Sequence, residues 1–248
     1  MNVDHSATLR QARYPSGTDG EPDPVLFALR CEAAGAHGIT AHLREDRRHI
    51  QDRDLIALRE RLQIGLNFEM ANTEEMVGIA TSLRPECACL VPEKREELTT
   101  EGGLNVVDSV NALRSTCRRL ADAGIVVSLF IDADCEQIDA SAETGAEYIE
   151  LHTGPYAEAY LRDPEAKQSA ITRLAQAAER ARAHGLKVNL GHGLNYENVA
   201  DVLVFPGIQE LNIGHSIVSR ALFDGVDRAV ADMLAAMSGY RLSGSTEG

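Results

Sequence analysis

One signal recurs along this chain: a stretch compatible with a helix ends at a glycine, and a short run of β-branched residues follows. The signal occurs at Gly35, Gly124, Gly145 and Gly185. Glycine suits the left-handed backbone position just past the end of a helix, so each of these residues marks the point where a helix leads into a strand. Strands that alternate with helices in this way predict βαβ units and a parallel sheet.

Eight segments fit the strand pattern, and each except the last precedes a helix-compatible segment. They are Met1–Val3, Ile39–Leu43, Leu66–Glu69, Ala88–Val91, Val126–Ile131, Tyr148–Leu151, Val188–Leu190 and Glu210–Ile213. A final helix is expected from about Ile217 to Met237. Eight such units in 248 residues favour a single-domain (β/α)₈ TIM barrel with extra helices over residues 1–240. An open Rossmann-like sheet is the alternative, but no G-x-G-x-x-G motif follows the first strand.

Two segments are expected to be mobile. The connection after the fourth expected strand, from Leu90 to about Val106, is long and rich in charged residues, threonine and glycine. That composition is typical of a lid loop over a site. Residues 241–248 consist mainly of glycine, serine and other polar residues, and we expect them to form a disordered tail.

Composition excludes several classes of protein. The formal net charge is −14, which argues against a nucleic-acid partner because phosphate backbones require a basic surface. No apolar stretch approaches the length of a membrane span, and the polar first residues do not resemble a signal peptide. The five cysteines lack the spacing of zinc or redox motifs, so we expect reduced core residues in a cytoplasmic protein.

Histidines gather at the carboxyl ends of the expected strands, where barrels of this type carry their chemistry. Six of the eight lie there: His5, His42, His49, His152, His192 and His215. Strand alternation also puts Asn67 with Glu69, and Glu150 with His152, on the inward face. A buried polar group is stable only when it is paired or binds something. Several that converge from different strands therefore predict a functional site.

Lysine usage limits the chemistry of that site. None of Lys94, Lys167 and Lys187 is expected to be buried at the carboxyl ends, so a Schiff-base aldolase is disfavoured. An amine in any carbonyl chemistry would have to come from a substrate. Histidines and carboxylates also suit a divalent metal, but no H-x-H or H-E-x-x-H motif is present, and no metal is expected.

Two glycine–histidine turns follow the last two expected strands, at 191–194 and 214–216. Barrels often hold phosphate on backbone N–H groups of the loops at these positions, and glycine lets the backbone approach the anion closely. A second cationic cluster, Arg44 to His49, suits another anion. For Arg47 and Arg48 within it, the alternative is a solvated, charged start of a helix.

The same residues form blocks that together span nearly the whole chain. The blocks are 2–5, 8–10 with Arg13, 42–50, 67–70, 73–76, 90–95, 99–103, 128–132, 150–154, 191–194 and 210–215. In this order they resemble the pyridoxine 5′-phosphate synthase family. The resemblance implies a transferase that joins 1-deoxy-D-xylulose 5-phosphate to 3-amino-2-oxopropyl phosphate, without metal or organic cofactor, and releases phosphate and water. It also implies a homo-oligomer, an octamer built from dimers.

The resemblance assigns roles to individual residues. His42 and Glu69 would act as proton acceptors, His192 as a proton donor, and Glu150 would stabilise charge in the transition state. The residues expected to contact the deoxyxylulose phosphate are Asp4, His5, Arg44, His49 and Thr99. Those expected to hold the amino-ketone phosphate are Asn2, Arg13, Gly193, Gly214 and His215.

Two other functions remain open from the residues alone. One is a divalent-metal barrel hydrolase or class II aldolase with His42, Glu69, His152 and His192 as metal ligands. The other is a non-catalytic barrel that binds phosphorylated metabolites. Binding alone does not require both His42 and Glu69, which argues against the second.

Overall fold

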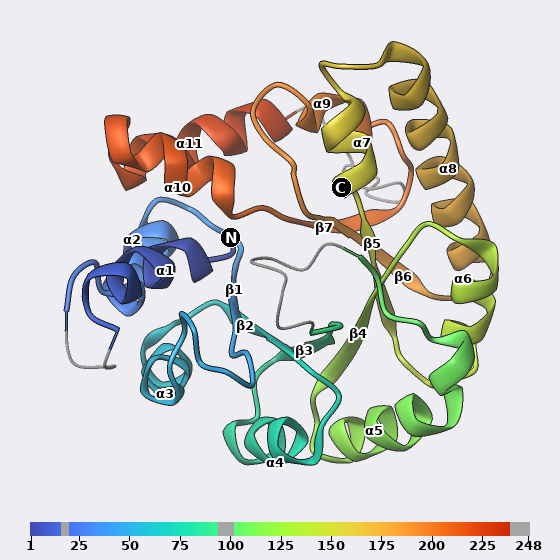
Figure 1. Ribbon diagram of the computed structural model, residues 1–248, viewed down its shortest axis with the longest axis horizontal. Helices are drawn as coiled ribbons and strands as arrows, with labels where there is room; N and C mark the ends of the chain where they lie inside the picture. Colours follow the sequence, from blue (N-terminus) through green and yellow to red (C-terminus); the bar gives the residue numbers. More distant parts are fainter. Residues whose placement is uncertain (16–19, 94–101, 239–248) are drawn as a thin grey trace, which may run out of the picture.

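A computed structural model describes residues 1–15, 20–93 and 102–238. Seven parallel strands form one sheet in chain order: β1 (Gly38–His42), β2 (Gly65–Met70), β3 (Cys87–Leu90), β4 (Val126–Ile131), β5 (Tyr148–His152), β6 (Lys187–Gly191) and β7 (Ile208–Asn212). The sheet curls around the centre of the molecule (Figure 1). The predicted α/β class and parallel sheet are confirmed.

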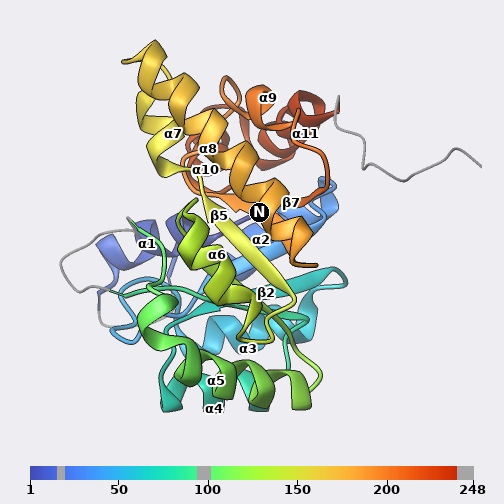
Figure 2. The same cartoon turned by 90° about the vertical axis from the view of Figure 1, so that its right-hand side faces the viewer.

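Helices lie on the outer side of the curled sheet (Figure 1), and Figure 2 shows α6 and α8 outside β5. They are α1 (Asp4–Arg13), α2 (Pro24–Ala33), α3 (Asp52–Arg61), α4 (Glu74–Leu83), the 3₁₀ turn η1 (Val107–Ser109), α5 (Val110–Asp122), α6 (Cys135–Ala142), α7 (Gly154–Ala159), α8 (Pro164–Ala183), α9 (Val199–Val202), α10 (His215–Asp224) and α11 (Val226–Met237). Aspartates begin two of these helices with a proline at the first position. The carboxylates of Asp23 and Asp163 each accept hydrogen bonds from two backbone N–H groups.

Residues 1–3 do not form the strand that the sequence predicted. They make a single parallel bridge, between Asn2 and Thr40. Helix α1 starts immediately afterwards, because the Asn2 side chain accepts a hydrogen bond from the Asp4 backbone N–H at 2.9 Å. The short segment still contacts both ends of the sheet: Val3 N–H donates to Thr40 O, and Asn2 N–H donates to Ile213 O, each at 3.0 Å.

The single final helix expected from about Ile217 to Met237 is two helices, α10 and α11. The break falls at Gly225, whose φ of 81° lies in the left-handed region that a continuing helix cannot use. Of the lid expected at 90–106, residues 94–101 lie outside the described residues, as does the whole tail expected at 241–248.

The two faces of the sheet have different chemistry. Outward side chains such as Phe68 and Leu129 belong to the large hydrophobic core that the sheet forms with the helices. On the inner side, Cys89, Val91 and Phe130 form only a small separate cluster. The remaining inner positions are largely polar, and this polar interior positions the site described next.

All five cysteines are free, and Cys31, Cys89 and Cys117 are buried as expected. The expectation is wrong for Cys135, which is exposed at the start of α6. Among residues 1–15, 20–93 and 102–238, no helix is both long and apolar enough to cross a membrane.

Candidate active site

The carboxyl ends of the strands bring the predicted catalytic residues together. His42 ends β1 and stands opposite Glu69 of β2 in the sheet register. A nitrogen of His42 and carboxylate oxygens of Asp4 and Glu69 all lie within 4.8 Å of one another. Parallel pairing explains the proximity, because neighbouring strands that end at the same level present their last inward side chains side by side.

Asp4 connects the first residues of the chain to β1. Its Oδ1 accepts a hydrogen bond from the His42 backbone N–H at 2.8 Å, and its Oδ2 accepts one from the Asn2 side-chain amide at 2.8 Å. Both oxygens of the Asp4 carboxylate therefore accept a hydrogen bond. Because one donor is the backbone of β1, the carboxylate is held in place beside His42.

The carboxyl groups of the half-buried Glu69 and the buried Glu150 share one amide. Asn212 Nδ2 donates to Glu69 Oε1 at 2.7 Å and lies 3.4 Å from Glu150 Oε1. Burial, with the charges of Glu150 and Asp4, raises the pKa of Glu69 well above its ordinary value. Burial and the charge of Glu210 raise the pKa of Glu150 to about 8. Two neighbouring acids that resist ionisation hold a proton between them at neutral pH, as acid–base sites require.

A glycine provides the space for one member of this pair. A Cβ added to Gly191 would collide with Glu150 Oε1, so only glycine fits at this position of β6. The sequence predicts that Gly191 lies in a phosphate-binding turn. In the structure it also makes room for the Glu150 carboxyl.

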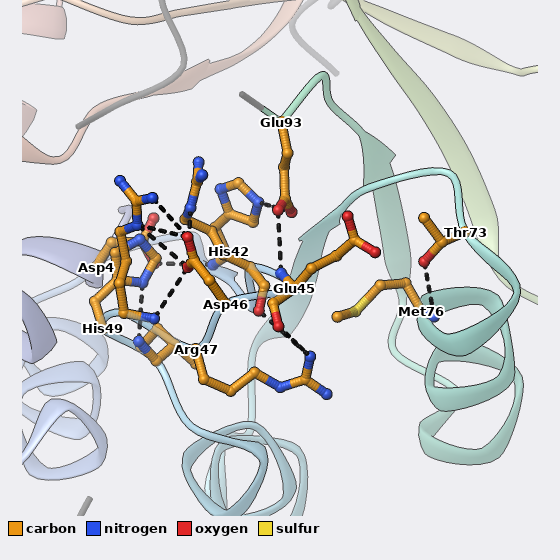
Figure 3. Close-up of polar contacts among 12 residues, drawn as sticks. Asp4, His42, Glu45, Asp46, Arg47, His49, Thr73, Met76 and Glu93 are labelled. Carbon is orange, nitrogen blue, oxygen red and sulfur yellow. Dashed lines mark hydrogen bonds and ion pairs between the residues drawn. The ribbon is translucent and has the colours of Figure 1, made fainter. Parts of the chain in front are cut away.

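His42 has a second carboxylate partner that the sequence did not single out. Glu93, just after β3, places Oε1 2.9 Å from His42 Nε2 (Figure 3). Its other oxygen accepts a hydrogen bond from the Glu45 backbone N–H at 3.0 Å. The histidine and glutamate side chains are 5% and 6% exposed, so water competes little with this contact.

The cationic segment after β1 divides into an inner and an outer part. Arg44 and His49 are buried, and burial lowers the pKa of His49. The His49 ring lies 5.9 Å from that of His42, centroid to centroid. Arg47 instead pairs with Asp52 and Glu75 at the surface, and Arg48 pairs with Asp46. For Arg47 and Arg48, these acidic partners agree with the alternative of a solvated, charged surface, although α3 itself begins only at Asp52.

His192 follows β6 in a backbone conformation unusual for a residue with a side chain. Its φ is 81°, and Gly193 after it has a φ of 79°. Such a conformation costs a non-glycine residue about 1 kcal/mol or more and is found mainly at functional sites. Burial, with the charges of His152 and His5, lowers the pKa of His192 to about 4.

An aspartate–histidine pair borders His192. His152 Nδ1 lies 3.0 Å from Asp132 Oδ1, and the rings of His152 and His192 are 5.1 Å apart, centroid to centroid. This hydrogen bond lowers the pKa of Asp132. Within the described part of the chain, His152 Nε2 is buried without a hydrogen-bond partner. Asp132 was not predicted as a site residue; its position at the end of β4 was the available signal.

The residues expected at the amino-ketone phosphate lie at two places. Gly193, Gly214 and His215 follow β6 and β7, and the ring of His215 is 5.0 Å from that of His5, centroid to centroid. Arg13 is exposed at the end of α1, where its guanidinium stacks on the neighbouring Tyr14. Thr99 lies outside the described residues.

The sequence of this chain is similar to a known family along almost its whole length. Residues 1–239 match the family described as pyridoxal phosphate biosynthesis protein PdxJ. The chain belongs to the PdxJ family. The predicted resemblance is therefore confirmed.

Two relatives illustrate the similarity to other PdxJ family members. A pyridoxine 5′-phosphate synthase of Aliivibrio fischeri is 58% identical over 241 residues, covering 97% of each chain. One of Geobacter sulfurreducens is 56% identical over 234 residues, covering 94% of this chain and 95% of the relative.

Solved structures with little sequence identity share the fold. KGPDC from Streptococcus mutans superposes with a TM-score of 0.63 at 8% identity, covering 96% of this chain and 95% of its own. Phosphoribosyl anthranilate isomerase from Thermus thermophilus superposes with a TM-score of 0.58 at 18% identity, covering 88% and 95%. At this identity the likeness concerns the fold alone, which is TIM-barrel-like.

The charge of His152 is one cause of the low pKa of His192, so His152→Gln is expected to raise that pKa. The value should stay below the ordinary one, because burial is the larger cause and persists in the variant. NMR titration of the His192 ring measures the change. His184→Gln is the matched control. His184 directly follows α8, and its side chain pairs with Asp139. An unchanged His192 pKa in His152→Gln would contradict the electrostatic coupling.

Proposed function

We propose that this chain is a pyridoxine 5′-phosphate synthase, which joins 1-deoxy-D-xylulose 5-phosphate to 3-amino-2-oxopropyl phosphate and closes the pyridine ring with release of phosphate and water. Membership of the PdxJ family supports the reaction. The geometric observation that carries it is the Glu69–Asn212–Glu150 group beside His42. Ring closure needs repeated proton transfers at carbon and oxygen, and such a group supplies both an acid and a base near neutral pH.

Hydrogen-bond lengths divide the roles within the carboxyl pair. The 2.7 Å hydrogen bond from Asn212 favours the ionised form of Glu69, whereas the contact with Glu150 is longer, at 3.4 Å. Within a pair that shares one proton, we assign the proton-accepting role to Glu69, whose raised pKa makes it a strong base when it is ionised. Glu150 keeps its proton at neutral pH and stabilises negative charge that develops on substrate oxygen.

The two histidines act on either side of this pair. His42, on β1, accepts a proton together with Glu69. His192 donates a proton to a leaving oxygen, and the arrival of a phosphate dianion beside Gly193 would favour its protonated form. The amine that attacks the ketone belongs to the amino-ketone substrate, so the chain needs no buried lysine and no organic cofactor.

The proposal also covers how the barrel is closed, how the site is shielded from water, and how the chain assembles. Residues 1–3, which bond to both Thr40 and Ile213, bridge the first and last strands and so close the sheet into a (β/α)₈-type barrel without forming a regular strand. The segment between β3 and η1 acts as a lid that keeps reactive imines from water. The chain works in the cytoplasm as a homo-oligomer, an octamer built from dimers, whose mass light scattering would measure.

The decisive experiment is product formation by purified protein from the two phosphorylated substrates. Pyridoxine 5′-phosphate, identified by mass and fluorescence, is the expected product. Folded protein that forms no product would overturn the proposed function.

A divalent-metal enzyme is the second candidate, because Asp4, His42 and Glu69 place ligand atoms within 4.8 Å of one another. This set differs from the four ligands considered from the sequence, since His152 and His192 do not belong to it. Each of its members already has a hydrogen-bond partner: Asn2, Glu93 and Asn212 respectively. That arrangement favours acid–base catalysis.

Exhaustive dialysis against EDTA is therefore expected to leave kcat unchanged. The measurement is product formation before and after dialysis, with metal content determined on the same samples. Loss of activity that a divalent cation restores would favour the metal-dependent candidate instead.

A further inference from the structure

The carboxylate of Glu93 bridges two neighbouring strand ends. The residue follows β3, and its side chain reaches the end of β1, as Figure 3 shows. Oε1 lies 2.9 Å from His42 Nε2, and Oε2 accepts a hydrogen bond from the Glu45 backbone N–H at 3.0 Å. Two contacts through two different oxygens hold the carboxylate in one orientation, so the plane of the His42 ring is constrained as well.

The charge state of Glu93 decides which nitrogen of His42 carries hydrogen. Burial alone would raise the pKa of Glu93, but the hydrogen bond and charge of His42, with the Glu45 N–H and Arg44, lower it. Glu93 is therefore ionised at neutral pH, and an ionised carboxylate only accepts hydrogen bonds. The hydrogen must then be on His42 Nε2, which leaves Nδ1 with a free lone pair in the neutral ring.

The other ring nitrogen of His42, Nδ1, makes no hydrogen bond within the described part of the chain. Among the described residues, the hydrogen bond of the His42 ring is the one to Glu93. The charged groups around the ring come from several elements: Asp4 from α1, Glu69 from β2, and Arg44 and His49 from the segment after β1. Nothing in this set replaces Glu93 as the partner of Nε2.

We propose that Glu93 is a positioning residue, which holds His42 in the tautomer whose Nδ1 lone pair accepts a proton from the substrate. This inference rests on the proposed role of His42 as a proton acceptor. The arrangement is chemically that of a carboxylate–histidine pair: the acid orients the imidazole and stabilises the cation formed when the ring accepts a proton.

Glu93→Gln tests the proposal, because the glutamine amide can either donate or accept and no longer selects one tautomer. The expected result is a kcat lower by roughly 10- to 100-fold, part of the 10²–10⁴-fold that a positioned base supplies. KM should change by less than about two-fold, since Glu93 does not bind substrate. Glu45→Gln is the matched control: Glu45 is exposed, and its backbone N–H rather than its side chain meets Glu93.

A tautomer measurement separates this role from a merely structural one. In ¹⁵N NMR spectra of the imidazole nitrogens, assigned with His42→Gln, the wild-type ring is expected in the Nε2–H form. The Glu93→Gln ring is expected as a mixture. In Glu93→Gly, added formate should restore part of the lost kcat, because a free carboxylate can occupy the vacated position; acetamide should not.

The experiments distinguish failure of the role proposed for Glu93 from failure of the proposed function. A predominantly Nδ1–H ring in the wild type, or an unchanged tautomer in Glu93→Gln, would overturn the role of Glu93. So would a higher kcat in Glu93→Gln, since it would mean that the carboxylate obstructs the site. If the wild type forms no pyridoxine 5′-phosphate, the proposed function fails, while the NMR spectra, which need no substrate, still decide the position of the hydrogen.

Discussion

Glu69→Gln is expected to lower kcat by about 10²–10⁴-fold, the contribution of a positioned general base. The amide has nearly the shape of the carboxyl, and its oxygen can still accept the hydrogen bond that Asn212 donates to Glu69. It cannot accept a proton from carbon or oxygen of the substrate. Loss of activity with an intact fold would therefore report the chemistry of the carboxylate rather than its packing. Rapid-mixing assays of product formation measure kcat, and circular dichroism checks the fold.

The matched control for this variant is Glu60→Gln, at an exposed position of α3. It makes the same chemical change far from the carboxyl pair and is expected to retain wild-type kcat. A Glu69→Gln protein with more than about a tenth of the wild-type kcat would mean that Glu69 is not the base. His42 alone would then be left as proton acceptor.

Glu150→Gln is expected to stabilise the protein at pH 8 while leaving its stability at pH 5 nearly unchanged. In the folded chain the pKa of Glu150 is raised to about 8, whereas in the unfolded chain the carboxyl ionises near its ordinary value of 4.5. Between these values the folded state binds more protons, so the free energy of unfolding falls as the pH rises, by about 1.4 kcal/mol per pH unit. Between pH 5 and pH 8 the wild type therefore loses on the order of a few kcal/mol that the glutamine variant keeps.

Urea unfolding of both proteins at several pH values from 5 to 8 measures this difference. Glu158→Gln, at an exposed position of α7, is the control and should follow the wild type. Glu69 titrates in the same direction, because its pKa is also raised, and it leaves part of the slope in the variant. Parallel curves for wild type and Glu150→Gln would show that the Glu150 carboxyl is not held protonated by its surroundings.

Much of the fold was predictable because it depends on neighbours in the chain. Short β-branched runs after glycines such as Gly124 and Gly185 placed strands β4 and β6 within a residue of their observed bounds. The placement of His42 and Glu69 at strand ends followed from the same local periodicity. The strand predicted at residues 1–3 was wrong, because the hydrogen bond from the Asp4 backbone N–H to the Asn2 side chain starts α1 there. The single final helix was wrong, because the positive φ of Gly225 divides it in two.

Partnerships between distant residues were not predictable, and they decide the chemistry of the site. Asn212 lies 143 residues from Glu69, and Glu93 lies 51 residues from His42. No local pattern marks either pair. Their proximity comes from strands that are brought together when the sheet curls, and burial at that point is what raises the pKa values of Glu69 and Glu150. Residue type and spacing thus identify which groups reach the strand ends, whereas tertiary packing removes water and decides which of them hold a proton.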